Sequence, residues 1–288
     1  PVYIYGGYRE GKIDAATFST VFRSIFLEGC GSPPDIKHIL DLLLKRFKHL
    51  GGELKMRKQV SRIDCEGGVF RAVELADGTR IEADRCLSSA GLLETGQLVG
   101  ENWGKACQLS VFETVVSVEA PLAELQADYT LQLISQQDRF QWAAPAKRGQ
   151  VDHLTLAASA CYDFAQEPRA KHFKIGCFQK GDLWLGLDEE TYQREKRLME
   201  EQMLNLLLQR YPGLRDFPAE HCESLTPRTV VTYTRHHNGG IYGGSEKTFD
   251  GTTPVENLFV VGNDQGGIGI MGALTSGVIV SNFQVILK

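Results

Sequence analysis

The chain has 288 residues, of which 42% are hydrophobic and 23% are charged, and its net charge at pH 7 is −5. This composition is typical of a soluble globular protein large enough for two lobes, and the lack of a basic excess argues against a nucleic-acid-binding function. The seven cysteines are scattered without a C-x-x-C pair, which predicts buried thiols in a reducing, cytoplasmic compartment rather than a zinc site or a disulfide framework. No apolar run approaches the roughly 20 residues that a membrane-spanning helix requires.

The first third of the chain predicts one helix followed by short strands. Apolar residues recur at helical spacing between positions 35 and 50, with Asp35 as the expected N-cap and Gly51-Gly52 as the stop. From residue 53 the pattern changes to alternation, interrupted by Gly-containing turns. We therefore expect a β-meander that runs into a short strand ending in small residues, with strands over 53–63, 69–75, 79–83 and 85–89. The chain begins with Pro1 and not with methionine, which is typical of a fragment or a processed product.

The middle of the chain predicts a larger antiparallel region and one long helix. The segment 188–211 is rich in Glu, Lys, Arg, Leu and Met and is followed by Pro212-Gly213, which predicts a helix with a sharp stop. β-Branched and aromatic residues favour strands on either side of it, which we expect at 109–118, 129–134, 140–144, 154–158 and 229–234. A Gly-rich hairpin at 239–244 then precedes a final strand, loop and helix.

A glycine-rich segment near the end of the chain carries the strongest functional signal. Residues 258–261 form a continuous apolar run, typical of a strand buried in a parallel sheet. Four glycines follow between Gly266 and Gly272, so the backbone can approach a ligand closely, and N–H groups at the start of the next helix can bind electron-rich atoms. Residues 267–272 match G-x-G-x-x-G, but too few residues follow for the second strand and the acidic residue of a dinucleotide-binding βαβ unit. The segment is therefore not a first phosphate-binding turn.

This segment resembles the closing motif of the phytoene desaturase-like branch of the FAD-dependent amine oxidase superfamily. In that family a strand ends in Gly followed by Asp or Ala, and a Gly-rich loop leads into a helix that begins Gly-Ala/Val-x-x-Ser-Gly. The matching residues here are Gly262, Gly267, Gly269, Gly272, Ser276 and Gly277. Three further stretches resemble the same family in the expected order, and together they cover most of residues 35–288: Leu50 to Gly91, Tyr211 to Leu214, and Leu225 to Gly243.

The sequence departs from the family pattern at two places. The family usually has Pro-x-Gly-Gly before the helix that we expect at 35–50, whereas this chain has Pro33-Pro34-Asp35-Ile36. The family's N-terminal Gly-rich βαβ unit, whose N–H groups and helix dipole cradle the pyrophosphate, has no counterpart in the sequence. We therefore expect a flavin lobe that lacks an N-terminal flavin-binding segment.

The resemblance implies FAD as the cofactor and assigns backbone positions to it. A valine backbone, Val60 here, would meet the adenine, and the end of the strand at 85–89 would lie beside the dinucleotide. The residue after Gly262 would lie near the ribityl or pyrophosphate group, and the acidic Asp264 stands one position later than the family pattern has it. Backbone at 270–273 would face the flavin pyrimidine edge. The implied cofactor-binding residues are Val60, Ser89, Ala90, Gly91, Gly262, Asn263, Asp264, Gly269, Ile270, Met271, Gly272 and Ala273.

His236-His237 is a candidate acid/base or metal-binding pair, for which a structural role is the preferred interpretation. Adjacent residues of a strand point to opposite sides, and no carboxylate lies at ligand spacing in the sequence. No catalytic residue and no metal site is predicted. This pattern fits flavin chemistry, in which the cofactor ring carries out hydride transfer and the protein supplies position and dryness.

The expected fold class is α/β. We expect an FAD/NAD(P)-binding Rossmann-like flavin lobe, incomplete at its N-terminus, at 1–100 and 236–288, with an inserted antiparallel-sheet (α+β) substrate domain at 101–235. The resemblance implies an FAD-dependent oxidoreductase that oxidises or desaturates a hydrophobic, isoprenoid or carotenoid-like small molecule by hydride transfer to flavin. Two alternatives stay open: an amine or porphyrinogen oxidase-type flavoenzyme, and a non-catalytic binding module or truncated fragment that does not hold FAD alone. A lipid-like substrate would fit peripheral membrane contact, although the sequence shows no clear amphipathic anchor.

Overall fold

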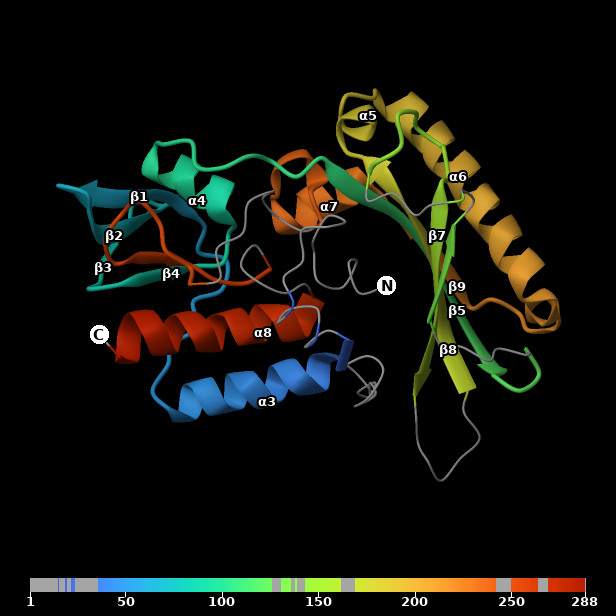
Figure 1. Cartoon of the computed structure of the whole chain (residues 1–288), viewed down its shortest axis with the longest axis horizontal. Helices are drawn as coiled ribbons and strands as arrows, with labels where there is room; N and C mark the ends of the chain where they lie inside the picture. The colour runs from blue at the N-terminus through green and yellow to red at the C-terminus, as the bar shows by residue number, and fades with distance from the viewer. Residues whose placement is uncertain are drawn as a thin grey trace. The chain divides into compact units, whose positions relative to one another are not determined.

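The computed structural model describes residues 36–125, 131–135, 138, 143–161, 169–241, 250–263 and 269–287, together with Ala15, Ser19, Phe22 and Arg23. The chain forms two compact units (Figure 1). Unit 1 comprises Pro1–Ser24, Lys55–Leu109 and Thr229–Lys288, and unit 2 comprises Ile25–Leu54 and Ser110–Arg228. The assignment of a flavin lobe and a substrate domain to the ranges expected from the sequence stays a prediction.

Unit 1 contains a small antiparallel sheet with the strand order β1-β2-β3 (Val60–Glu66, Val69–Leu75 and Arg80–Glu82). The turn between β1 and β2 is tight because Gly67 and Gly68 both adopt positive φ, at 61° and 80°. Apolar side chains of the sheet, among them Ile63 and Phe70, are buried in a cluster that includes Trp103. Cys86, Leu258 and Leu92, which belong to elements described below, also pack in this cluster.

Unit 1 also contains a parallel pair of strands from distant parts of the chain. β4 (Cys86–Ser88) pairs with β10 (Leu258–Val260), with Leu258 opposite Cys86 and Val260 opposite Ser88. All three residues of β10 are buried, which confirms the predicted strand of the parallel-sheet type. A parallel pair has both carboxyl ends at one edge, and α4 (Leu92–Val99) and α8 (Gly269–Val280) are the helices that follow the two strands.

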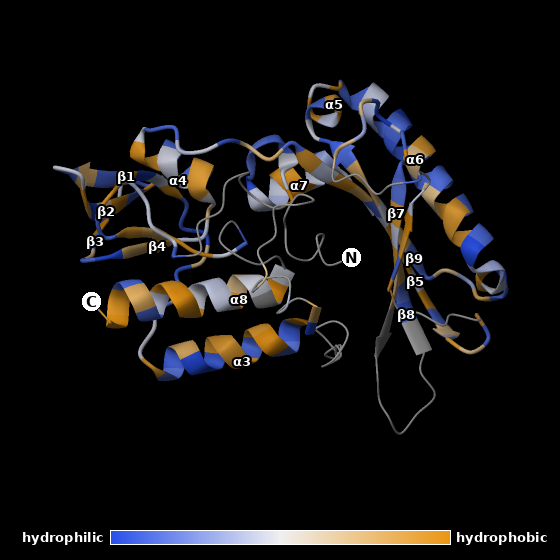
Figure 2. Cartoon of the chain, viewed as in Figure 1, coloured by the Kyte–Doolittle hydropathy of each residue, from blue (hydrophilic) through white to orange (hydrophobic). Residues whose placement is uncertain are grey.

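Unit 2 is built on a five-stranded sheet with the order β6-β7-β8-β5-β9 (Leu131–Ser135, His153–Cys161, Arg169–Lys180, Leu109–Pro121 and His221–Leu225). The long helix α6 (Glu189–Arg210) contributes Met199, Met203 and Leu207 to a core that also contains Phe112 of β5 and Phe173 of β8. Figure 2 shows the apolar residues of α6 interspersed with polar ones along the helix. Strand residues of the opposite parity to Phe112 and Phe173 lie on the other face of the sheet.

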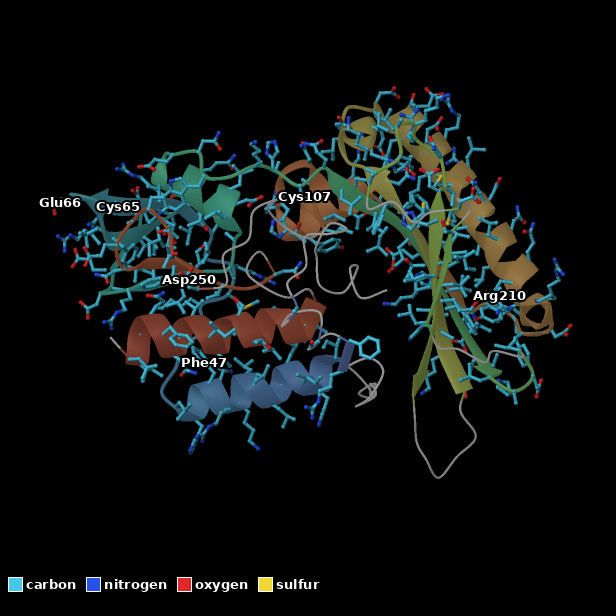
Figure 3. The ribbon with its side chains drawn as sticks, in the orientation of Figure 1. Phe47, Cys65, Glu66, Cys107, Arg210 and Asp250 are labelled. Atoms are coloured by element: carbon cyan, nitrogen blue, oxygen red, sulfur yellow. The ribbon has the colours of Figure 1, made fainter. Side chains whose placement is uncertain are left out.

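The ends of α6 are fixed by side-chain contacts. Asp188 caps the start, since its carboxylate accepts a 2.9 Å hydrogen bond from the backbone N–H of Thr191. In the last turn Arg210 (Figure 3) donates from Nε to Oε1 of Gln132 at 2.8 Å and so ties the helix to β6. The 3-10 helix η1 (Pro212–Asp216) follows at once. These ends confirm the helix predicted for 188–211.

The segment expected as a strand at 229–234 is instead the end of helix α7 (Pro227–Thr234). Its β-branched residues favour a strand, but Pro227 stands at the first helical position, where its fixed φ suits a helix. Arg228 also holds this start in place, because its guanidinium donates to the carbonyl of Leu187 and to the carboxylate of Glu189. Tertiary contacts therefore decide the conformation against the local preference.

The remaining expectations are met in part. The first helix is confirmed as α3 (Ile36–His49), while its expected cap Asp35 lies outside the described residues. Residues 53–59 were expected to begin a strand and lie outside any strand, whereas α4 was not predicted at all. The predicted strand at 140–144 and the predicted hairpin at 239–244 lie partly outside the described residues. Within the hairpin range, Gly239 ends the 3-10 helix η2 (His237–Gly239). Smaller elements are α5 (Asp182–Leu185) and η3 (Ser281–Ile286), which extends α8.

In the described part of the chain, no helix has both the length and the apolar character to cross a membrane.

Candidate cofactor site

The carboxyl ends of β4 and β10 meet at one edge of unit 1. The backbone N–H of Val261 donates to the carbonyl of Ser88 at 2.8 Å, so the ladder continues to the ends of both strands. A Cβ atom built on Gly262 would lie 3.8 Å from Cβ of Ser89, which shows that the two following loops touch. Ligands of open α/β sheets bind outside the carboxyl ends of parallel strands. The structure thus brings together Ser89, Ala90, Gly91 and Gly262, four of the residues that the sequence assigned to a cofactor.

Three glycines at this edge adopt backbone conformations that other residues rarely adopt. The φ angles of Gly91, Gly262 and Gly269 are 108°, 98° and 75°. A Cβ atom built on Gly269 would meet no atom within 4 Å, so the first residue of α8 borders open space. Backbone without side chains next to open space is what a flat cofactor ring requires, and these residues therefore fit the predicted flavin.

The start of α8 is held by hydrogen bonds from the loop before it. Oδ1 of Asn263 accepts from the N–H of Gly269 at 3.0 Å, and Nδ2 of Asn263 donates to the carbonyl of Ile241 at 3.1 Å. The N–H of Gly262 donates to Oγ of Ser276, a buried side chain on the same helix, at 3.1 Å. The helix begins at Gly269, three residues before Gly272, where the matched family motif has its helix begin. Asn263 acts on this helix start through its side chain.

Ile270, Met271 and Gly272 lie in the first turn of α8, and Ala273 follows directly. First-turn N–H groups have no acceptor within their own helix, and they lie at the positive end of the helix dipole. This arrangement supports the predicted contact with an electron-rich ligand edge. Asp264 lies outside the described residues.

Val60 takes a different position from the other predicted residues. It is the first residue of β1, in the antiparallel sheet, and it packs against the cluster around Ile63 and Phe70. Its contact with adenine stays a prediction.

A half-buried carboxylate and a half-buried histidine meet beside the same edge, which the sequence analysis missed. Oε1 of Glu94, in the first turn of α4, lies 3.4 Å from Nδ1 of His236 and accepts a 2.8 Å hydrogen bond from the backbone N–H of His237. Both side chains of the Glu94–His236 pair are about 15% exposed. Burial alone would raise the pKa of the Glu94 carboxyl, but the close His236 ring and the hydrogen bond from the His237 backbone hold that pKa below its usual value.

No carboxylate lies at ligand spacing from His236-His237 in the sequence, but the fold supplies Glu94 as a partner, and the strand assumed for these two residues is wrong. The backbone leaves α7 through Arg235, whose positive φ of 62° and whose N–H bond to the carbonyl of Val231 form a left-handed helix end. Asn238 also has positive φ, at 56°. This turn carries His236 to Glu94. Among the described residues, no group of three His, Cys, Asp or Glu side chains could hold a metal ion.

The structure is similar to the crystal structure of an oxidoreductase from Methanosarcina mazei, with a TM-score of 0.53 and 20% sequence identity over 85% of this chain and 54% of that protein. The chain has the fold of FAD-dependent oxidoreductases. The predicted α/β fold class is thereby confirmed. No protein-family profile and no curated protein sequence matches the chain.

Two further solved structures are less similar to this chain. One is iminodiacetate oxidase from Chelativorans sp. BNC1, with a TM-score of 0.44 and 12% identity over 85% of this chain and 53% of that protein. The other is L-proline dehydrogenase from P. horikoshii, with a TM-score of 0.43 and 13% identity over 88% of this chain and 56% of that protein. The chain thus spans about half the length of each of these proteins.

Proposed function

We propose that this chain belongs to an FAD-dependent oxidoreductase and carries part of its flavin site at the carboxyl ends of β4 and β10. The observation that carries the proposal is the parallel β4–β10 pair, from which the side-chain-free backbone of Gly262 and Gly269 leads into α8. The oxidoreductase fold supports it. When bound, the flavin ring would supply the hydride-accepting group of the reaction.

The residues of this chain would bind and orient the cofactor. N–H groups in the first turn of α8 would donate to the electron-rich edge of the ring, with the helix dipole favouring negative charge there. Asn263 keeps the start of α8 in place through its bond to Gly269. The open space around Gly269 would allow the ring to lie close to the backbone.

The Glu94–His236 pair would hold a proton at a defined atom. The Glu94 carboxylate, 3.4 Å from Nδ1 of His236, favours the proton on that nitrogen. In the neutral imidazole of His236, Nε2 is then the acceptor nitrogen. Glu94 lies in the first turn of α4, where its negative charge disfavours a second anion. We therefore place the cofactor's charged groups at α8 and not at α4.

The substrate is the finer part of the proposal. The resemblance of residues 35–288 to the phytoene desaturase-like branch supports oxidation or desaturation of a hydrophobic, isoprenoid or carotenoid-like molecule. An amine or porphyrinogen oxidase-type reaction is the competing enzyme function. A substrate panel with bleaching of flavin absorbance as the readout separates them, since the isoprenoid proposal requires faster flavin reduction by isoprenoids than by amines.

The cofactor proposal is tested by titrating the chain with FAD and following the flavin fluorescence. The chain is expected to bind FAD weakly, because it spans only about half the length of similar oxidoreductases. Gly269→Val is expected to lower the affinity at least about tenfold, since its side chain would fill the space left for the ring. Gly78→Val is the matched control, because Gly78 also has positive φ, at 81°, with no atom within 4 Å, but lies in the turn between β2 and β3.

Equal FAD affinity of the two variants would contradict the site at α8. A wild-type chain that binds no FAD at any concentration would contradict cofactor binding by these residues, and would favour the non-catalytic binding module as the function of this chain.

A further inference from the structure

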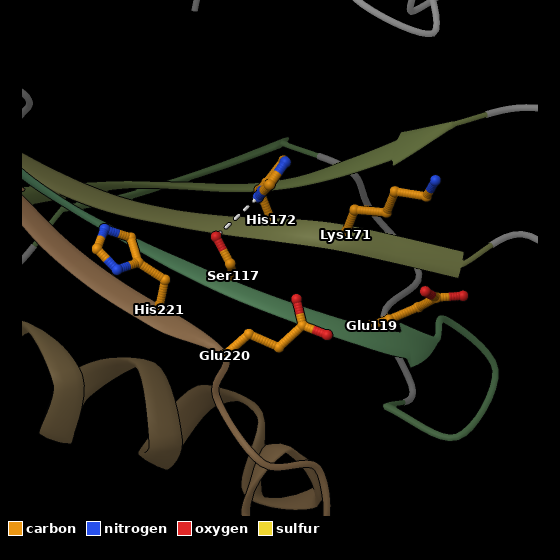
Figure 4. A pocket seen from close by; sticks show the side chains of 6 residues that line it. All are labelled: Ser117, Glu119, Lys171, His172, Glu220 and His221. Atoms are coloured by element: carbon orange, nitrogen blue, oxygen red, sulfur yellow. Dashed lines mark hydrogen bonds between the residues drawn. The ribbon is translucent and has the colours of Figure 1, made fainter.

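A shallow cavity of about 410 Å³ opens in unit 2 (Figure 4). Its volume lies within the range of small-molecule sites. By their parity along the strands, Ser117, Glu119 and His172 lie on the face of the sheet opposite the core with α6. The lining residues come from three neighbouring strands and the residue before one of them: Ser117, Glu119, Lys171, His172, Glu220 and His221.

A β-bulge brings two adjacent side chains of β8 to this cavity. In the ladder between β7 and β8, Ser159 pairs with His172 and Ala160 pairs with Ala170, so Lys171 is the extra residue. Adjacent residues of a regular strand point to opposite faces. The bulge re-aims the side chain, and both Lys171 and His172 line the cavity as a result.

Hydrogen bonds position two of the lining residues. Oγ of Ser117 lies 3.2 Å from Nδ1 of His172, as the dashed line in Figure 4 marks, so Nε2 is the ring nitrogen left for a ligand. The backbone N–H of Glu220 donates to the carbonyl of Ser117 at 2.9 Å, which fixes the start of the Glu220 side chain beside β5. The cavity is therefore organised by the sheet and does not depend on a loop alone.

The lining side chains carry charges of both signs. Lys171 is positive and Glu220 is negative, and neither side chain forms an ion pair within the part of the chain that the structure describes. Oppositely charged side chains that line one cavity without pairing to each other can each pair with one end of a ligand of mixed charge.

We propose that this cavity binds a small zwitterion, namely an amino acid or a similar ammonium carboxylate. Its carboxylate contacts Lys171 and Nε2 of His172, and its ammonium group contacts the carboxylate of Glu220. The cavity is open and its charged residues are exposed, so water and salt screen these contacts. We expect a Kd of roughly 1 mM that rises with ionic strength.

The test is a titration of the full chain with L-alanine at constant neutral pH, in which NMR follows the Cε1–H signals of the histidine rings. Signals of His172 and His221, assigned with the variants His172→Gln and His221→Gln, are expected to shift and saturate. The signal of His49 on α3 is the internal control and is expected to stay in place.

Two variants report on the two charges. Lys171→Met and Glu220→Gln are each expected to weaken alanine binding roughly fivefold, the upper range for a surface ion pair. Lys174→Met removes an exposed lysine from the same strand outside the cavity and is expected to leave the affinity unchanged.

Propionate and ethylamine, which each carry one of the two charges, decide between ligand classes. Each is expected to bind more weakly than alanine. Propionate that binds as tightly as alanine, together with an unaffected Glu220→Gln variant, would identify an anion site and overturn the proposal. The absence of any His172 shift at roughly tenfold the expected Kd would overturn it as well. Neither outcome bears on the FAD titration, because the cavity residues all belong to unit 2.

Discussion

Replacing Gly251 by alanine is expected to destabilise unit 1, because this glycine combines a left-handed backbone with a lack of space. Its φ is 68°, and a Cβ atom built on it would lie inside contact distance of the carbonyl oxygen of Val260 and 2.6 Å from Cγ2 of Val280. The N–H of Val260 donates to the carbonyl of Gly251 at 2.8 Å. The close approach is therefore part of the packing that holds β10 against α8.

The expected loss has a backbone part and a packing part. A left-handed conformation costs an alanine about 1–2 kcal/mol. An extra methyl group in a packed site adds about 1–3 kcal/mol, and a backbone carbonyl cannot move aside as a flexible side chain would. We therefore expect Gly251→Ala to lower the free energy of unfolding by about 2–5 kcal/mol.

Gly67→Ala separates the two parts of this loss. Gly67 has a similar φ of 61°, but a Cβ atom there meets nothing within 4 Å, so only the backbone cost of about 1–2 kcal/mol applies. The assay is urea unfolding followed by the fluorescence of Trp103, which is buried in unit 1, in a background where the other tryptophans are phenylalanine. With a urea dependence of about 1–3 kcal/mol per M, Gly251→Ala should unfold at about 1 M less urea than Gly67→Ala. Coincident transitions of the two variants would refute the steric part of the reasoning.

Three further perturbations test other contacts. Asn263→Ala removes the acceptor of the Gly269 N–H, so we expect it to lower the free energy of unfolding by about 1 kcal/mol and to weaken FAD binding. A variant that is unchanged in both thermal unfolding and FAD titration would contradict this role of Asn263. The folded-state pKa of Glu94 is lowered, so its charge stabilises the fold above the unfolded-state pKa and this contribution is lost as the pH falls through the folded-state pKa. Glu94→Gln should therefore lose less stability than the wild-type chain on acidification, which urea unfolding at each pH measures. Arg228→Leu removes a cation–π contact of 4.2 Å with Tyr192 and charged hydrogen bonds. We expect it to lower the free energy of unfolding in urea by about 2 kcal/mol. A urea midpoint equal to that of the wild-type chain would show that these contacts do not stabilise the fold.

Elements with strong local signals were predictable from the sequence. The helix α6 consists of good helix formers, with an acidic cap directly before it and a proline shortly after it. β10 is a continuous apolar run before glycines. The same holds for the glycines at the carboxyl end of β10, since glycine adopts positive φ without the steric cost that other residues have. The edge formed by Ser89 and Gly262 could be proposed because a family resemblance placed the two segments together.

Elements that depend on distant contacts were not predictable. α4 contains Gly96, which weakens any helical signal, yet a Cβ atom at that position would lie 2.8 Å from the ring of Trp103. The glycine is there for packing and obscures the helix. In the same way, the carboxylate beside His236 comes from Glu94, and residues 110–228 of unit 2 separate the two in the sequence. A search for a carboxylate a few residues from His236 could not find it.

The pairing of β4 with β10 also affects how a cell makes this chain. A ribosome releases β4 before the whole sheet of unit 2, whereas β10 emerges after that sheet is complete. Throughout this interval β4 presents an unpaired strand edge, the kind of surface that recruits other chains and holdase chaperones. Translation that stops before Leu258 is therefore expected to leave a polypeptide in which this edge of β4 stays unpaired, which favours aggregation and removal by proteases.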